Sequence, residues 1–181
     1  MRFITFVVLI FSSMLIAGSY GALHDQISFT VSEEYFTKFK YKQFGFMHSD
    51  LPDRIKAAII GYRASWWMGI PIGLIIGAFG FLHHTPRLMF IRSIKALGIT
   101  TIVALVIGLG GLVYGSFFIS HDINQSSRWY SPDEIVNPSR FLAVGYMHNF
   151  SYLGGLVGIL AGITSQFIQR SKPTKMQNKI E

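Results

Sequence analysis

The chain has 181 residues, of which half are hydrophobic, 14% are charged and 18 are glycine. A soluble domain of this length rarely combines so few charges with so much apolar surface, so the composition indicates an integral membrane protein. The absence of cysteine excludes disulfides, thiolate metal ligands and a cysteine nucleophile. The net charge of +7 does not indicate nucleic-acid binding, because the basic residues lie between apolar runs.

Four apolar runs are each long enough to cross a bilayer core, which takes about 20 residues. They predict transmembrane helices over residues 1–23, 57–82, 96–119 and 141–168. Helices are expected because lipid leaves backbone polar groups no partner outside the segment. Pro52 before the second run, and Asn137 with Pro138 before the fourth, are typical of helix starts. We therefore predict an all-α integral membrane fold with four transmembrane helices.

The first run also has features of a cleavable secretory signal. It begins Met1-Arg2 and ends near the small residues Ser19 and Gly21. Its apolar stretch is longer than that of a usual signal peptide, and the internal repeat described below pairs it with the third run. We expect the first helix to be retained.

The connecting segments differ in length and composition. They are a cap over 24–56, a short basic turn over 83–95, a second loop over 120–140 and a basic tail over 169–181. The alternation in ISFTVS at 27–32 favours a short β-strand within the cap. The segment EEYFTKFKYKQF at 33–44 interleaves aromatic residues with lysines, which is typical of a cap lying on helix ends at a membrane interface.

Smaller signals lie on the same loops. SPDE at 131–134 is a capping-box pattern that predicts a short helix in the second loop. Four aromatic residues are expected to form an outer belt: Trp66, Trp67, Trp129 and Tyr130. His83 and His84 lie on the inner turn, where a solvated setting is favoured over haem ligation because no inner histidine is predicted opposite them.

Orientation follows from the basic residues beside the predicted helix ends. If the amino terminus is inside, the inner segments hold eight basic residues against the single acid Glu181, which accounts for the whole net charge. The eight are Arg2, Arg87, Arg92, Lys95, Arg170, Lys172, Lys175 and Lys179. The positive-inside rule then predicts a bacterial inner-membrane protein with both termini in the cytoplasm and the cap in the periplasm.

The chain contains an internal repeat, in which the first predicted helix corresponds to the third and the second matches the fourth at an offset of 84 to 85 residues. Tyr20-Gly21 and His24-Asp25 correspond to Tyr114-Gly115 and His121-Asp122. The second and fourth helices carry matched glycine stripes, namely Gly69, Gly73 and Gly77, and Gly154, Gly158 and Gly162. Glycine at every fourth position lets two helix backbones approach closely. We predict two pseudo-repeated hairpins related by a two-fold axis along the membrane normal, with the second and fourth helices packed through these stripes.

Four motifs in this chain resemble those of an uncharacterised family of small bacterial four-helix membrane proteins. HDQIS, SEEYFT, ASWWMG and MHNFSYLGG occur in the family's order, and the likeness covers about residues 20–162. The resemblance implies that the following residues are typical: Asp25, Gln26, Glu34, Tyr35, Phe36, Thr37, Trp66, Trp67, His148, Asn149, Ser151 and Tyr152. His24 is not a fixed feature of that pattern, and the family implies no activity.

Polar residues are predicted to gather at the outer side of the bundle. The candidate cluster consists of Asp25, Gln26, Arg63, Asp122, His148 and Asn149. Ionisable residues inside a membrane helix are costly and usually face a partner or water. A structural interpretation therefore pairs Arg63 with Asp25 or Asp122, and lets His148 and Asn149 bond across helices.

Three functions remain open. The first is a structural, accessory or partner-binding membrane component, in contact with the bilayer and with another membrane protein or a second copy of itself, and without a cofactor. The second is a small transporter or metal-binding protein, with an outward-facing site of His24, His121, His148 and an aspartate. Adjacent His-Asp residues are poorly placed to face one ion, which counts against it. The third is an outer-leaflet enzyme with His148 as base, for which no nucleophile or cofactor motif is found.

Overall fold

The computed structural model describes residues 1–119 and 135–171. Within these residues, four helical segments are long and apolar enough to cross a membrane: Arg2–Val31, Asp53–Gly80, Pro86–Phe118 and Pro138–Arg170. Large apolar side chains point outward from them, for example Phe11 with 60% of its surface exposed and Leu160 with 66%. Such exposure is expected of a surface that faces lipid tails and not water. The prediction of a multi-pass helical membrane protein is confirmed.

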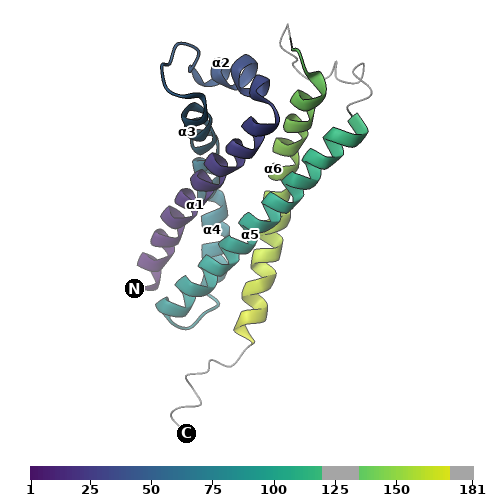
Figure 1. The fold of residues 1–181 in the computed structure, drawn as a ribbon. Coiled ribbons are helices and arrows are strands. Elements are labelled where there is room, and N and C mark those ends of the chain that lie inside the picture. The colour runs from purple at the N-terminus through teal and green to yellow at the C-terminus, as the bar shows by residue number, and fades with distance from the viewer. Residues whose placement is uncertain (120–134, 172–181) are drawn as a thin grey trace.

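The helices run alternately up and down the bundle (Figure 1). In chain order they are α1 (Arg2–Val31), the π-helix η1 (Tyr35–Lys40), α2 (Tyr41–Phe44), α3 (Asp53–Ser65), the 3₁₀ turn η2 (Trp66–Met68), α4 (Gly69–Gly80), α5 (Pro86–Tyr114), the π-helix η3 (Gly115–Ile119) and α6 (Pro138–Arg170). The start of α1 and the end of α6 lie at the same end of the bundle. Asn137 caps α6 by accepting from the Arg140 N–H, and Pro138 occupies the first turn, as predicted.

The predicted β-strand at 27–32 is wrong. Residues up to Val31 continue α1, Ser32 is its C-cap, and the described parts of the chain contain no strand. The polar side chains of this stretch bond back along the helix, since the Ser28 hydroxyl donates to the His24 carbonyl and the Thr30 hydroxyl to that of Gln26. An alternating pattern of six residues is too short to distinguish a strand from a helix whose backbone must satisfy its own hydrogen bonds.

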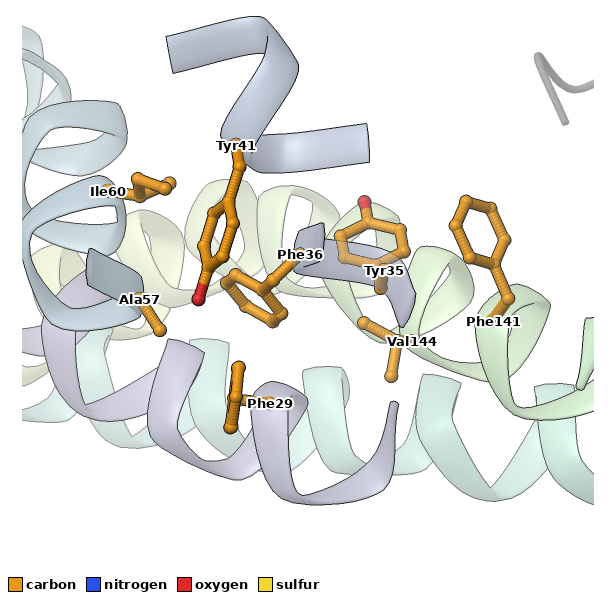
Figure 2. Close-up of a cluster of buried hydrophobic side chains, with 8 residues drawn as sticks. All are labelled: Phe29, Tyr35, Phe36, Tyr41, Ala57, Ile60, Phe141 and Val144. Atoms are coloured by element: carbon orange, nitrogen blue, oxygen red, sulfur yellow. The ribbon is translucent and has the colours of Figure 1, made fainter. Parts of the chain in front are cut away.

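The segment 33–44 folds across the end of the bundle opposite the termini (Figure 1). Tyr35, Phe36 and Tyr41 of this segment belong to a buried cluster between α1, α3 and α6 (Figure 2). The cluster consists of Phe29, Tyr35, Phe36, Tyr41, Ala57, Ile60, Phe141 and Val144. Phe36 is fully buried at its centre, so this segment is packed onto the helices as part of the core.

Hydrogen bonds tie the same segment to the helices beside it. The Glu34 carboxylate accepts from the backbone N–H groups of Val136 and Asn137, both at 2.8 Å, just before α6 begins. The Tyr41 hydroxyl donates to the Asp53 carbonyl at the start of α3, at 3.0 Å. A carboxylate at a helix start satisfies free N–H groups and complements the helix dipole. Glu34 therefore joins the cap to the last helix.

We predicted that the glycine stripes pack the second helix against the fourth, but each stripe packs mainly against the other helix of its own hairpin. The stripe on α4 lies against α1, and the stripe on α6 lies against α5. Gly73, for example, packs on Ile10 and Ser13, whereas Gly158 packs on the Thr100 backbone. Each hairpin thus uses its own glycines to hold its two helices together. A repeated stripe identifies a close-packed helix face, but it cannot show which neighbour lies against that face.

The contact between α4 and α6 near the termini includes a buried polar link beside apolar packing of Phe79 on Phe167. Gln166 is fully buried, donates to the Ile76 carbonyl at 2.8 Å, and lies 3.2 Å from the Nε2 atom of His83. The other ring nitrogen of His83 faces the Arg92 guanidinium at 3.2 Å, so Nδ1 must accept and Nε2 must donate. The Arg2 guanidinium donates to the carbonyls of Phe81 and His83.

The setting of His83 differs from the solvated turn that the sequence indicated. The side chain is 1% exposed, while its neighbour His84 is exposed as expected. Burial lowers the pKa of His83, and the nearby Arg92 lowers it further. The ring is therefore a neutral hydrogen-bonding link between the inner turn and α6.

Candidate functional site

Three ionisable side chains converge inside the bundle, two from α1 and one from α6. His24, Asp25 and His148 are buried, and their potential ligand atoms lie within 4.8 Å of one another. The Asp25 Oδ1 atom is 3.3 Å from His24 Nδ1 and 3.1 Å from His148 Nε2. One carboxylate oxygen thus faces both imidazole rings, which meet edge to face with their centroids 4.7 Å apart.

Neighbouring groups fix the orientation of the His148 ring. Its Nδ1 atom lies 2.9 Å from the Val144 carbonyl, which only accepts hydrogen bonds, so Nδ1 must carry a proton. The Tyr35 ring stacks on the imidazole at a centroid distance of 5.0 Å. Because a neutral imidazole has one N–H, Nε2 then presents a lone pair to Asp25. This arrangement requires a positive charge between them, either an extra proton or a metal ion.

A chain of hydroxyl groups supports the His24 ring. Its Nε2 atom is 3.0 Å from the Ser151 hydroxyl on α6, which in turn accepts from the Tyr20 hydroxyl at 3.2 Å. The Ser28 hydroxyl lies on the other side of the ring, 3.5 Å from Nδ1. Both histidines therefore have one nitrogen toward Asp25 and the other toward a hydrogen-bonding group.

Two of the three separations between the ligand atoms suit a small tetrahedral metal ion. Ligands held about 2.0–2.1 Å from a tetrahedral zinc ion are roughly 3.3–3.4 Å from one another. The two separations from Asp25 Oδ1, 3.3 and 3.1 Å, agree with that value. Histidine ligands of metals usually donate their second N–H to a carbonyl or another fixed acceptor, as His148 does. The expectation that adjacent His-Asp residues would point apart is therefore wrong for this pair.

A cavity of about 90 Å³ opens beside the cluster. In the same measure one water molecule takes roughly 10–15 Å³, so the space holds roughly six to nine waters or part of a ligand. Its polar end carries His24, Asp25, His148, Tyr20 and Lys40. The rest of its wall is mainly apolar and comes from α1, α4 and α5, including Ile16, Ile72 and Leu97. A catalytic or transport metal site keeps an open coordination position, and this cavity would supply one.

The other residues of the predicted cluster lie elsewhere. Arg63 is exposed with its guanidinium over the Phe44 ring, so the predicted Arg63–Asp25 ion pair is wrong. Gln26 donates to the Arg54 carbonyl of α3 at 2.9 Å, so it lies on another face of α1 from the cluster. Asn149 is exposed, although it follows His148 directly. His121 and Asp122 lie outside the described residues, as do the capping box at 131–134, Trp129 and Tyr130.

Sequence reasoning did not identify four polar residues around the cluster as its partners. They are Tyr20, Ser28, Lys40 and Ser151. Ser28 and Ser151 carry a usable signal, since each lies three or four residues from a site histidine and thus on the same helix face. Lys40 carries no such signal, because only the fold of the cap brings it to the cavity.

Comparisons of this chain with protein-family models, with curated proteins and with solved structures found no match. The resemblance stated from the motifs therefore stays a prediction. Function has to be argued from the geometry of the cluster and its cavity alone.

Proposed function

We propose that this is a multi-pass membrane protein that binds a divalent transition-metal ion of the zinc type inside its helix bundle. His24, Asp25 and His148 are the proposed ligands, with the cavity providing a fourth position for water or a solute. This develops the metal-binding alternative of the sequence analysis, without His121. The proposed function is therefore to handle a metal ion within the membrane, either as a small transporter or as a carrier of the bound ion.

One observation carries the proposal. The Nδ1 proton of His148 is committed to the Val144 carbonyl, so Nε2 presents a lone pair to a carboxylate 3.1 Å away. Two facing acceptors repel each other, and burial strengthens that repulsion because the local dielectric is low. A divalent cation bound by both atoms, and by the neighbouring Nδ1 of His24, removes the conflict. Imidazole and carboxylate together are ligands that zinc and similar ions prefer.

The test is zinc binding by the purified protein. After removal of metal by a chelator in mild detergent, we expect the protein to take up one zinc ion per chain. His148→Ala should weaken binding by at least about 100-fold, because even outer-shell changes typically cost 10–100-fold. Zinc at about 100 times its dissociation constant should raise the stability of the wild-type protein by ~2.7 kcal/mol, measured as thermal unfolding.

His84→Ala is the matched control, since His84 is an exposed histidine far along the chain from the cluster. It should bind zinc as the wild type does. Equal loss of zinc in both variants would place the ion on surface histidines. A folded wild-type protein that takes up no zinc, cobalt or manganese would rule out the metal site.

A structural function is the second candidate, and the same geometry offers a reason for it. If His148 is protonated on both nitrogens, its two N–H groups donate to Val144 and Asp25, and the cluster is satisfied without a metal. It would then act as interhelical glue between α1 and α6 in an accessory membrane component. In that case His148→Ala should lower stability to the same extent with and without zinc.

The finer topology is also a proposal. We infer a bacterial inner-membrane protein with both termini in the cytoplasm and the cap over 24–56 in the periplasm, supported by the eight basic residues of the inner segments. The two pseudo-repeated hairpins are inferred from the matched motifs of the two halves. Reporter fusions after Lys95 and after Glu181 should report the cytoplasm, and a fusion at Gln43 should report the periplasm. A cytoplasmic signal at Gln43 would reverse the assignment.

A further inference from the structure

Lys40 places a positive charge at the cavity with no anion beside it. Its side chain is 8% exposed, and its ammonium lies over the rings of Tyr35, Phe39 and Phe44, 5.5–5.8 Å from their centroids. Among the described residues, no carboxylate lies within ion-pair distance of it and no group accepts a hydrogen bond from it. Aromatic faces attract a cation but do not accept its three N–H groups as an oxygen does.

Asp25 does not supply the missing negative charge. The pKa of Lys40 is lowered by burial, and Asp25 opposes that shift only from a distance. The single charge of Asp25 is already balanced by the cation it shares with His148, whether that is a proton or a metal ion. With Lys40 protonated, the polar end of the cavity carries a net positive charge in either case.

The opposite wall of the cavity has a different character. Ile16, Ala17, Met68, Ile72 and Leu97 line it with apolar side chains. The cavity lies among helices that are long and apolar enough to cross a membrane, so lipid acyl chains are the apolar molecules most abundant around it. A molecule that satisfies both ends needs an anionic head and a hydrocarbon tail.

We propose that this cavity binds an anionic amphiphile, with its carboxylate or phosphate on Lys40 and its acyl chain along the apolar wall. The binding goes beyond the metal site and does not depend on it, because Lys40 is uncompensated with or without a bound ion.

Photolabelling in a neutral bilayer tests the proposal. A palmitate analogue with a diazirine in its chain is irradiated with the chelator-treated protein in phosphatidylcholine nanodiscs, and the labelled residues are mapped by mass spectrometry. We expect labels on the cavity wall at residues such as Ile72 and Leu97, with displacement by unlabelled palmitate but not by hexadecanol. Labels confined to outward-facing residues such as Phe11 and Leu160, or equal displacement by the alcohol, would overturn it.

Variants of the lysine sharpen the test. Lys40→Gln should reduce cavity labelling about tenfold, since hydrogen bonds to a charged group are the strongest contacts the site offers. Lys42→Gln, two residues away and exposed, should label as the wild type does. If Lys40→Gln does not fold, Lys40→Arg should retain labelling. The displacement of the label by palmitate but not by hexadecanol in the wild-type protein also tests the proposal without any variant.

A second probe separates the two sources of the anion. Phosphatidylglycerol carrying the same diazirine chain is compared with palmitate and with the zwitterionic phosphatidylcholine analogue. Cavity labelling by palmitate alone identifies a free fatty acid, and labelling by phosphatidylglycerol identifies an anionic lipid. Equal cavity labelling by all three probes would show that charge plays no part. Because the protein is free of metal throughout, failure of the zinc titration leaves these results unaffected.

Discussion

Gly61→Ala is expected to destabilise the protein severely, although it adds only one methyl group. A Cβ atom on Gly61 of α3 would overlap the carbonyl oxygen of Gly21 on α1, and a Cβ atom on Gly21 would overlap that of Gly61. The two helix backbones touch at this point. The overlapping atoms are main-chain atoms that cannot rotate away, so the cost should be about 3 kcal/mol or more, at the upper end for overpacked sites.

The measurement is the yield of monodisperse protein in detergent, followed by its thermal unfolding. Gly110→Ala is the control, because a Cβ atom there meets nothing within 4 Å on the outward face of α5. That change should be neutral or stabilise by ~0.5–1 kcal/mol, as replacement of an exposed helical glycine usually does. Similar unfolding temperatures for the two variants would mean that α1 and α3 do not cross at these glycines.

The second large effect is expected from Asp25→Ala. The carboxylate is the shared partner of His24 and His148, so its removal leaves two buried imidazoles facing each other without an acceptor. Loss of a buried hydrogen-bonding partner typically costs 1–3 kcal/mol, so chelator-treated Asp25→Ala should unfold at a clearly lower temperature. Zinc uptake should disappear in the same variant, because the only anionic ligand of the proposed site is gone.

Arg63→Ala made on top of Asp25→Ala should recover nothing. The Arg63 guanidinium lies over Phe44 and is exposed, so the two changes should add independently in a double-mutant cycle. Asp53→Ala is a control for loss of a carboxylate as such, since its ion pair with Lys56 is half exposed, and it should cost less than about 1 kcal/mol. Rescue by Arg63→Ala would restore the pairing inferred from sequence and count against the histidine cluster.

The number and type of the membrane helices could be predicted from the sequence because the bilayer imposes both. An apolar run of about 20 residues can do little else than form a helix there. The helix boundaries near Asn137 were also readable, since capping residues act locally. The course of residues 27–31 was not, because a short alternating pattern fits both a strand and a helix. The packing of the cap against α1 and α6 determines the conformation of that segment.

The site was only partly predictable for a related reason. Its two α1 residues are adjacent in the chain, and a polar pair at the end of an apolar run is visible in any sequence. Their partner His148 lies 123 residues away from Asp25, and no local pattern reports which helix face meets which. Charge alone made Arg63 a reasonable prediction for the countercharge of Asp25. In the structure, however, its guanidinium is exposed and lies over the Phe44 ring. Lys40 reaches the cavity only through the fold of the cap.

The long reach of the contacts made by α6 has a consequence for how the chain is assembled. Gln166 bonds His83 and Ile76, 83 and 90 residues earlier, and His148 and Ser151 complete the cluster that begins on α1. During synthesis the first three spans enter the bilayer before α6 exists, so at that stage Asp25 lacks His148 and His83 lacks Gln166. The nascent protein therefore passes through a three-helix stage in which two polar sites still lack their α6 partners. The packing of α6 against the other helices then completes both polar sites at once.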